Sequence, residues 1–160
     1  MTSWLDLEHA APHITTEGHA LLLRARVAML GTLRPDGSPR ISPIEPAVTD
    51  GQLIFGVMPW SGKARDLHRD QRCVLHNAIS SPDAGEPELK LSGVAAAAST
   101  PLRDAASQAW WTGQPRMAAD VFVLELTEAV LIEWDLEHGR MTSTRWSSGH
   151  GLRQQSRNYP

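Results

Sequence analysis

Ser61, Gly62 and Lys63 lie within the segment Trp60–Leu67, where a β-prone run gives way to helical spacing. A helix start carries unpaired backbone N–H groups and a partial positive charge, so it attracts anions. Ser61 suits an N-cap, Gly62 lets a ligand approach the backbone, and Lys63 adds a point charge suited to phosphate. The segment predicts a phosphate site, although taken alone the tripeptide more often marks a capped helix with solvated side chains.

A second candidate surface is the expected strand Arg40–Val48, which Pro43 and Pro46 interrupt. Proline cannot donate to a β-ladder, so this strand should lie at an edge, carry a bulge or face a ligand. Arg40 or Arg65 would add a guanidinium able to grip a phosphate with two hydrogen bonds.

The remaining candidates have simpler explanations. The sequence has seven histidines and one cysteine, with no metal-binding spacing, so we expect no metal site. Cys73 sits in an apolar strand and is expected to be a buried, inert thiol. Trp110 and Trp111 would either stack on a flat ligand or pack against the barrel. Gly149-His150-Gly151 is expected to be a flexible turn near the end of the chain.

These residues must be positioned by strands and a few short helices. Helices are expected at 20–25, 61–70 and 102–111, and strands at 27–33, 40–48, 53–58, 72–79, 89–99, 121–126 and 129–135, with 140–146 as a further candidate. The first three strands are joined by tight turns and are expected to form a meander. With no alternation of strand and helix, the pattern predicts one domain over residues 1–160. Its fold class is mostly β, a mainly antiparallel split β-barrel of six or seven strands with peripheral helices.

Composition narrows the function classes. The formal charge of −3 argues against non-specific nucleic-acid binding, which needs a basic surface. A single cysteine excludes an intrachain disulfide and favours a reducing compartment. We see no signal peptide and no apolar run of about 20 residues, so a cytoplasmic protein without a membrane span is expected.

The order of these features resembles the amino-terminal half of the pyridoxamine 5′-phosphate oxidase-like split barrels. The features are a strand, the turn Pro35-Asp36-Gly37, a proline-containing strand, a glycine turn, a strand, and Ser61-Gly62-Lys63 four residues before Leu67. The resemblance runs from about Val27 to Thr100 and continues more weakly to Trp146.

The resemblance implies a homodimer that binds FMN at its interface, with a strand along the flavin ring and a helix start at the flavin phosphate. The cofactor-binding residues that it implies are Arg40, Ile41, Ser42 and Pro43 on the ring-side strand, Met58, Trp60, Ser61, Gly62, Lys63 and Ala64 at the phosphate end, and Trp146 near the partner's flavin. The implied activity is that of a flavin-dependent oxidoreductase with a small-molecule substrate, for which a nicotinamide cofactor would be the hydride donor.

The chain also departs from this family. True pyridoxamine phosphate oxidases carry arginine where this chain has Gly62, and they end in an arginine-rich tail that the sequence after Arg145 does not match. Pyridoxamine phosphate is therefore a poor candidate substrate. The alternatives are an F-420 type deazaflavin held by Arg65, Arg69 and Arg72, haem with His76 as axial ligand, or a ligand-binding protein without enzymatic activity.

Overall fold

The computed structural model describes residues 2–81, 84–110 and 119–159. The helices of this part of the chain are α1 (Trp4–Ala10), α2 (Pro12–Ala25), α3 (Gly62–Arg69) and α4 (Thr100–Trp110). Its strands are β1 (Ala28–Leu33), β2 (Pro39–Ile44), β3 (Pro46–Thr49), β4 (Gln52–Val57), β5 (Arg72–Asn77), β6 (Glu88–Ala97), β7 (Asp120–Asp135), β8 (Arg140–Ser147) and β9 (Gly151–Asn158). The mostly β, antiparallel architecture is as predicted, with nine strands in the described residues rather than six or seven.

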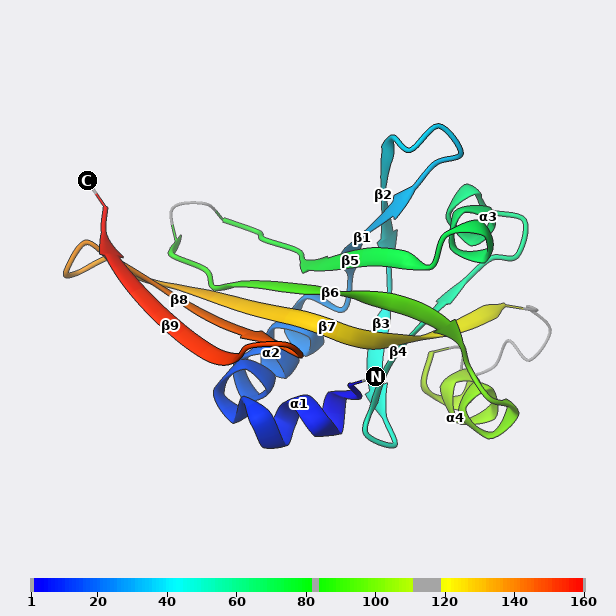
Figure 1. Ribbon diagram of the computed structural model, residues 1–160, viewed down its shortest axis with the longest axis horizontal. Helices are drawn as coiled ribbons and strands as arrows, with labels where there is room; N and C mark the ends of the chain where they lie inside the picture. The colour runs from blue at the N-terminus through cyan, green and yellow to red at the C-terminus, as the bar shows by residue number, and fades with distance from the viewer. Residues whose placement is uncertain (1, 82–83, 111–118, 160) are drawn as a thin grey trace.

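The proline-containing segment connects the two ends of the sheet. The sheet order is β2-β1-β5-β6-β7-β4-β3, and β8 and β9 extend it from β7. The expected strand Arg40–Val48 breaks at Glu45, so that its first half pairs with β1 and its second half with β4. Figure 1 shows β2 and β3 following one another across the long strands β6 and β7. The pairings of the predicted three-strand meander are therefore observed, since segment 40–48 pairs with β1 through β2 and with β4 through β3. The middle strand is broken, however, and its two halves lie at opposite ends of the sheet order.

Strand β7 is a single strand where two were expected. The interruption in its apolar pattern is a β-bulge, because Ser92 pairs with Glu128 while Gly93 pairs with Leu126. A Cβ on Gly93 would lie 2.1 Å from the Glu125 carbonyl oxygen, so only glycine allows the two strands to approach this closely. The bulge lets one long strand serve both the barrel and the extension formed by β8 and β9.

Two helices cover one side of the sheet (Figure 1). Helix α1, which we did not expect, begins with a capping box in which Ser3 and Asp6 bond each other's backbone N–H groups. Helix α2 begins at Pro12, eight residues before the expected start, because proline is well placed in a first helical turn. These helices add Leu7 and Ile14 to a core that the inward-facing strand residues fill. The largest fully buried strand side chains are Leu30, Leu53, Ile54, Phe55, Leu75, Leu89, Leu91, Leu124 and Leu126.

The described residues also bear on the expectations that the chain has no membrane span and no metal site. Within the described residues, no helix is both long enough and apolar enough to cross a membrane. The same part of the chain brings no three His, Cys, Asp or Glu side chains together as metal ligands. Trp111 lies outside the described residues, as does the side chain of Trp110.

Candidate functional site

The start of α3 has the cap that the sequence predicted. Ser61 is the N-cap residue in an extended conformation, and its Oγ accepts a hydrogen bond from the Ala64 backbone N–H at 3.2 Å. The backbone N–H groups of Gly62 and Lys63 lie in the first turn, where a helix provides no acceptors of its own. The helix therefore presents donors and the positive end of its dipole at this point.

Lys63 joins this helix start to the proline-containing strand. Its Nζ donates a hydrogen bond to the Pro43 carbonyl oxygen at 2.6 Å, across 20 positions of sequence. Partial burial lowers the pKa of the Lys63 ammonium, since burial disfavours the charged form. The two segments that the sequence analysis singled out, β2 and the start of α3, are therefore neighbours in space.

Gly62 is the residue at which Arg40 approaches the helix. A Cβ on Gly62 would lie 2.9 Å from Cζ of Arg40, so a larger residue would push the guanidinium away. Arg40 reaches this position from β2, and its Nε donates to Asp66 Oδ2 at 2.6 Å. Pyridoxamine phosphate oxidases have an arginine at the position of Gly62. In this chain the guanidinium of Arg40 occupies the space next to this glycine.

A buried carboxylate holds this arrangement together. Asp66 is 1% exposed and accepts hydrogen bonds from Arg40 and from Thr32 Oγ1, the latter at 2.9 Å. Arg69 adds a longer contact of 3.5 Å to the other carboxylate oxygen. Burial by itself would raise the pKa of Asp66, but the hydrogen bonds from Arg40 and Thr32 outweigh it and hold the pKa below 3.8. Asp66 is therefore ionised near neutral pH and fixes α3 against β1 and β2.

Exposed side chains lie beside the contact between Arg40, Asp66 and the start of α3. Trp60 is 74% exposed, and its carbonyl oxygen accepts a 2.7 Å hydrogen bond from Arg65 that ties the preceding loop to α3. Ile41 and Met58 are also exposed, whereas Ser42 is half-buried. The exposed side chains of Trp60, Ile41 and Met58 provide an apolar surface beside the positively charged start of α3.

Two of the residues named by the resemblance lie in the core instead. Ala64 is fully buried, because its side chain points from α3 into the barrel. Trp146 is 6% exposed and belongs to the same core, since it alternates along β8 with the outward-facing Arg145 and Ser147. A side chain in the core cannot lie against a cofactor on the surface, so we leave Trp146 out of the proposed site.

The outer face of the sheet connects β2 to the far edge strand. Cross-strand pairing aligns two complete rows of residues on this face, from β2 through β1, β5, β6, β7 and β8 to β9. One row is Pro43, Met29, His76, Lys90, Val130, Arg145 and Arg153, and the other is Ile41, Gly31, Val74, Ser92, Glu128, Ser147 and Gly151. The β2 end of these rows is apolar and the β9 end is polar and basic.

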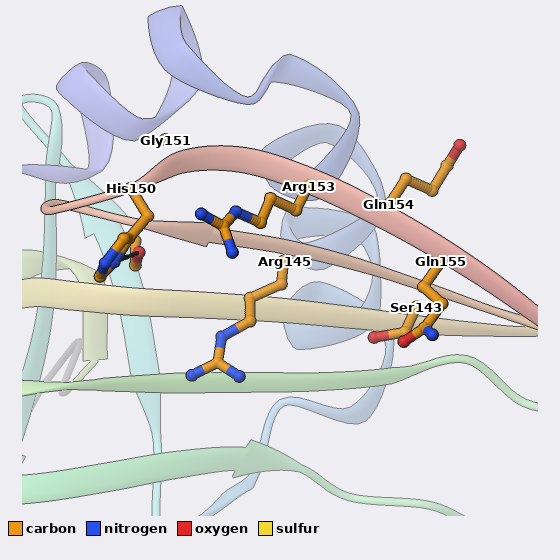
Figure 2. A pocket seen from close by; sticks show the side chains of 8 residues that line it. Ser143, Arg145, His150, Gly151, Arg153, Gln154 and Gln155 are labelled. Carbon is orange, nitrogen blue, oxygen red and sulfur yellow. Dashed lines mark hydrogen bonds between the residues drawn. The ribbon is translucent and has the colours of Figure 1, made fainter.

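A pocket of about 640 Å³ lies on this face at the β8–β9 hairpin. Figure 2 shows Arg145 and Arg153 on one side of the hairpin and Gln154 extending to the other. This pocket could not be predicted from the sequence, because the eight residues of β9 are all exposed and lack the apolar alternation that predicts a strand. The turn expected at Gly149-His150-Gly151 overlaps the connection between β8 and β9, which covers residues 148–150, and Gly151 begins β9.

The fold and the site together define a split β-barrel with a basic, phosphate-compatible helix start beside an edge strand. The family model for pyridoxamine 5′-phosphate oxidase matches residues 14–135, which is more than half of the chain. The chain therefore belongs to the pyridoxamine 5′-phosphate oxidase-like family of split barrels. No curated protein matches the sequence significantly.

Solved structures with the same fold come from proteins described as having different functions. A haem-binding protein from Mycobacterium smegmatis is 18% identical, with a TM-score of 0.66, 92% of this chain covered and 58% of that one. This chain thus spans little more than half the length of that protein. A pyridoxamine 5′-phosphate oxidase-related, FMN-binding protein from Nostoc punctiforme is 15% identical, with a TM-score of 0.66 and coverage of 96% and 97%.

A third structure contains a bound organic acid. PhzG from Burkholderia lata, in complex with tetrahydrophenazine-1-carboxylic acid, is 14% identical, with a TM-score of 0.65 and coverage of 98% and 93%. At these identities the likeness establishes the fold alone, because proteins of one fold carry out different chemistry.

Proposed function

We propose that this protein is a flavin-dependent oxidoreductase that binds FMN non-covalently, with its phosphate at the start of α3. The observation that carries the proposal is the position of the Arg40 guanidinium over Gly62, one residue from Lys63. Two side-chain cations and the first-turn N–H groups of a capped helix converge there, and phosphate is the anion that this donor set suits. A bound flavin would supply the redox chemistry.

The residues of this chain would bind and orient the cofactor. Ser61 and Lys63 would anchor the phosphate, while the backbone of Ile41–Pro43 would run along the ring system. Lys63 already donates to the Pro43 carbonyl oxygen, so the same contact sets the distance between the phosphate end and the ring end of the site. Hydride transfer to a flavin does not require a side-chain acid or base, and a nicotinamide cofactor is the proposed hydride donor.

A homodimer is part of the proposal. Ile41, Met29 and Val74 are 70%, 37% and 42% exposed, and their strands β2, β1 and β5 are neighbours on the outer face. A contiguous exposed apolar surface of this kind is typical of a protein interface. Because Ile41 belongs to the proposed ring-side strand, an interface there would also exclude water from the flavin.

Three arginines bear on the choice between FMN and an F-420 type deazaflavin, because each already makes an ion pair or hydrogen bond within the chain. The longer acidic tail of a deazaflavin would need cations, for which Arg65, Arg69 and Arg72 are the candidates. Arg72 already pairs with Asp70 at 2.6 Å, and Arg69 is engaged by Asp66 and the Leu33 carbonyl oxygen. Arg65 donates to the Trp60 carbonyl oxygen. Arg40 and Lys63 also have partners within the chain, but they belong to or approach the capped start of α3, which is where the phosphate is proposed to bind.

Haem is also less suited to the residues present. His76, the candidate axial ligand, has Nδ1 at 2.7 Å from the Asn77 carbonyl oxygen, and its Nε2 lies 3.6 Å from Glu88. Both ring nitrogens therefore face oxygen atoms of the chain itself. A protein that has lost its cofactor is the remaining alternative, and a binding experiment separates it from the flavin proposal.

The test is a pair of titrations of cofactor-free protein, one with FMN and one with riboflavin, which has the same ring system without the phosphate. We expect FMN to bind at least about tenfold more tightly, because each charge-assisted hydrogen bond contributes about 1.5–3 kcal/mol. Equal affinities would remove the phosphate site from the proposal. Absence of binding by both molecules would favour a non-enzymatic protein.

A further inference from the structure

The pocket at the β8–β9 hairpin has a composition unlike that of the rest of the surface. Its lining includes Arg145, Arg153 and His150, together with the hydrogen-bonding side chains of Ser143 and Gln155. No carboxylate is among the eight described residues that line it. The chain as a whole has a formal charge of −3, so this pocket is a local concentration of positive charge on an acidic protein.

The two arginines are direct cross-strand neighbours. Arg145 on β8 pairs with Arg153 on β9, so their side chains leave the same face with Cβ atoms about 4.5–5.5 Å apart. Like charges in this arrangement repel each other and destabilise the pair. A bound anion between them would turn this repulsion into attraction.

Only one of these charges is compensated within the described part of the chain. Arg145 donates to Glu128 on the neighbouring strand β7, whereas the guanidinium of Arg153 has no hydrogen-bonding or ionic partner among the described residues. Arginine carries its charge at any physiological pH and presents a planar array of donors. Arg153 therefore offers an unused bidentate donor at the centre of the pocket.

The other lining groups complete a set of donors around this position. On the same face of the hairpin, Ser147 and Gly151 form the next cross-strand pair toward the turn, and Ser143 and Gln155 form the next pair away from it. The Ser147 hydroxyl also lies 3.4 Å from Nδ1 of His150, which brings the turn residue to the rim of the pocket. Figure 2 shows Ser143, Arg145, His150, Arg153 and Gln155 along one side of the hairpin.

We propose that this pocket is a second anion site, which takes the phosphate or carboxylate groups of a small molecule between Arg145 and Arg153. Its volume of about 640 Å³ lies within the range of about 300–1,000 Å³ usual for small-ligand sites. The site is separate from the start of α3, because β1, β5, β6 and β7 lie between β2 and β8 in the sheet. It does not depend on flavin binding.

The experiment is calorimetric titration of the whole chain at low ionic strength with pyrophosphate and, separately, with succinate. The Lys63→Ala background weakens the α3 anion site, at which Arg40 and the first-turn N–H groups remain, and the Arg153 variant described below assigns the binding that is left. We expect at least one probe to bind in this background, and the probe that binds more tightly identifies phosphate or carboxylate as the preferred group. Failure of both probes to bind would overturn the proposal.

Two further variants locate the binding. Arg153→Gln in the same background should weaken binding about tenfold or more, since it removes a charge-assisted bidentate contact. Arg157→Gln is the matched control, because Arg157 lies on the same exposed strand and does not line the pocket. It should change the affinity by less than about twofold. Equal losses in the two variants would show general electrostatic attraction and would contradict a defined site.

Discussion

The Nζ of Lys63 lies 2.6 Å from the carbonyl oxygen of Pro43, and this hydrogen bond joins the first turn of α3 to strand β2. Proline lacks an N–H group but keeps its carbonyl, which is why a proline in an edge strand still provides an acceptor here. The contact aligns the proposed phosphate anchor with the strand proposed to run along the flavin ring.

Replacing Lys63 by alanine should weaken FMN binding and leave riboflavin binding unchanged. The lost ammonium would contact the phosphate, which only FMN carries, and a drop of about tenfold or more in FMN affinity is expected. Lys90→Ala is the matched control, because Lys90 is the other lysine of the chain and lies on β6. Fluorescence titration measures both affinities. If Lys63→Ala bound FMN as tightly as the natural protein, Lys63 would not belong to the site.

Asp66→Asn should reduce stability most at neutral pH. The folded-state pKa of Asp66 is lowered, so its contribution is fully present above the unfolded value of about 3.8 and is lost as the pH falls through the folded value. Breaking a buried ion pair costs about 3–5 kcal/mol when a charge is left unpaired, and the polar asparagine should keep the loss below that range.

Urea unfolding of the natural protein and of Asp66→Asn at several pH values measures this dependence. The difference in unfolding free energy between the two proteins should shrink as the pH is lowered from 7 to below about 4. A difference that stayed constant over this interval would mean that the ionised form of Asp66 does not hold Arg40 and Thr32 in place.

Cys73 should resist thiol reagents while the protein is folded. It is 9% exposed, and burial raises the pKa of its thiol to about 12, so the reactive thiolate is scarce at pH 8. Labelling with a disulfide reagent should be slow in the native protein and complete within minutes in denaturant. Rapid labelling of the native protein would show that β5 opens or that the thiolate is stabilised.

Val74→Glu should convert the proposed dimer to a monomer without unfolding it. Val74 is 42% exposed on the outer face, and a buried, unpaired carboxylate at an interface is strongly unfavourable. Leu23→Glu is the control, because Leu23 is 65% exposed on α2 and lies outside the proposed interface. Light scattering at micromolar concentration gives the mass of each variant. A natural protein that is monomeric in this measurement would remove the dimer from the proposal.

The sequence predicted the segments whose local signals agree with their tertiary environment. The Ser61 cap and the apolar spacing of Ala64 and Leu67 define α3, and the structure buries both of these side chains. The β1–β2 hairpin likewise has its turn at Gly37, which adopts a φ of 81° that glycine tolerates. These elements hold most of the proposed cofactor residues, so the segments of the candidate site could be predicted from the sequence, whereas cofactor binding there remains a proposal.

Features that depend on distant contacts could not be predicted in the same way. Strand β9 consists of exposed polar residues and forms only because β8 offers it a partner, so its sequence has no periodic signal. The placement of Arg40 over Gly62 depends on the buried carboxylate of Asp66, which belongs to a different element. Trp146 was expected near a flavin but lies in the core, because successive residues of β8 face opposite sides of the sheet and the sequence did not show which side each one takes.

The most direct test of FMN binding is an absorbance spectrum of the protein purified as expressed, followed by mass spectrometry of the released cofactor. We predict a flavin spectrum and the mass of FMN, from a site at which loss of Lys63 reduces the amount retained. A deazaflavin or haem spectrum would contradict the choice of cofactor. A colourless protein that gains no thermal stability from added FMN would contradict flavin binding itself, because a ligand that binds the folded state must raise the melting temperature.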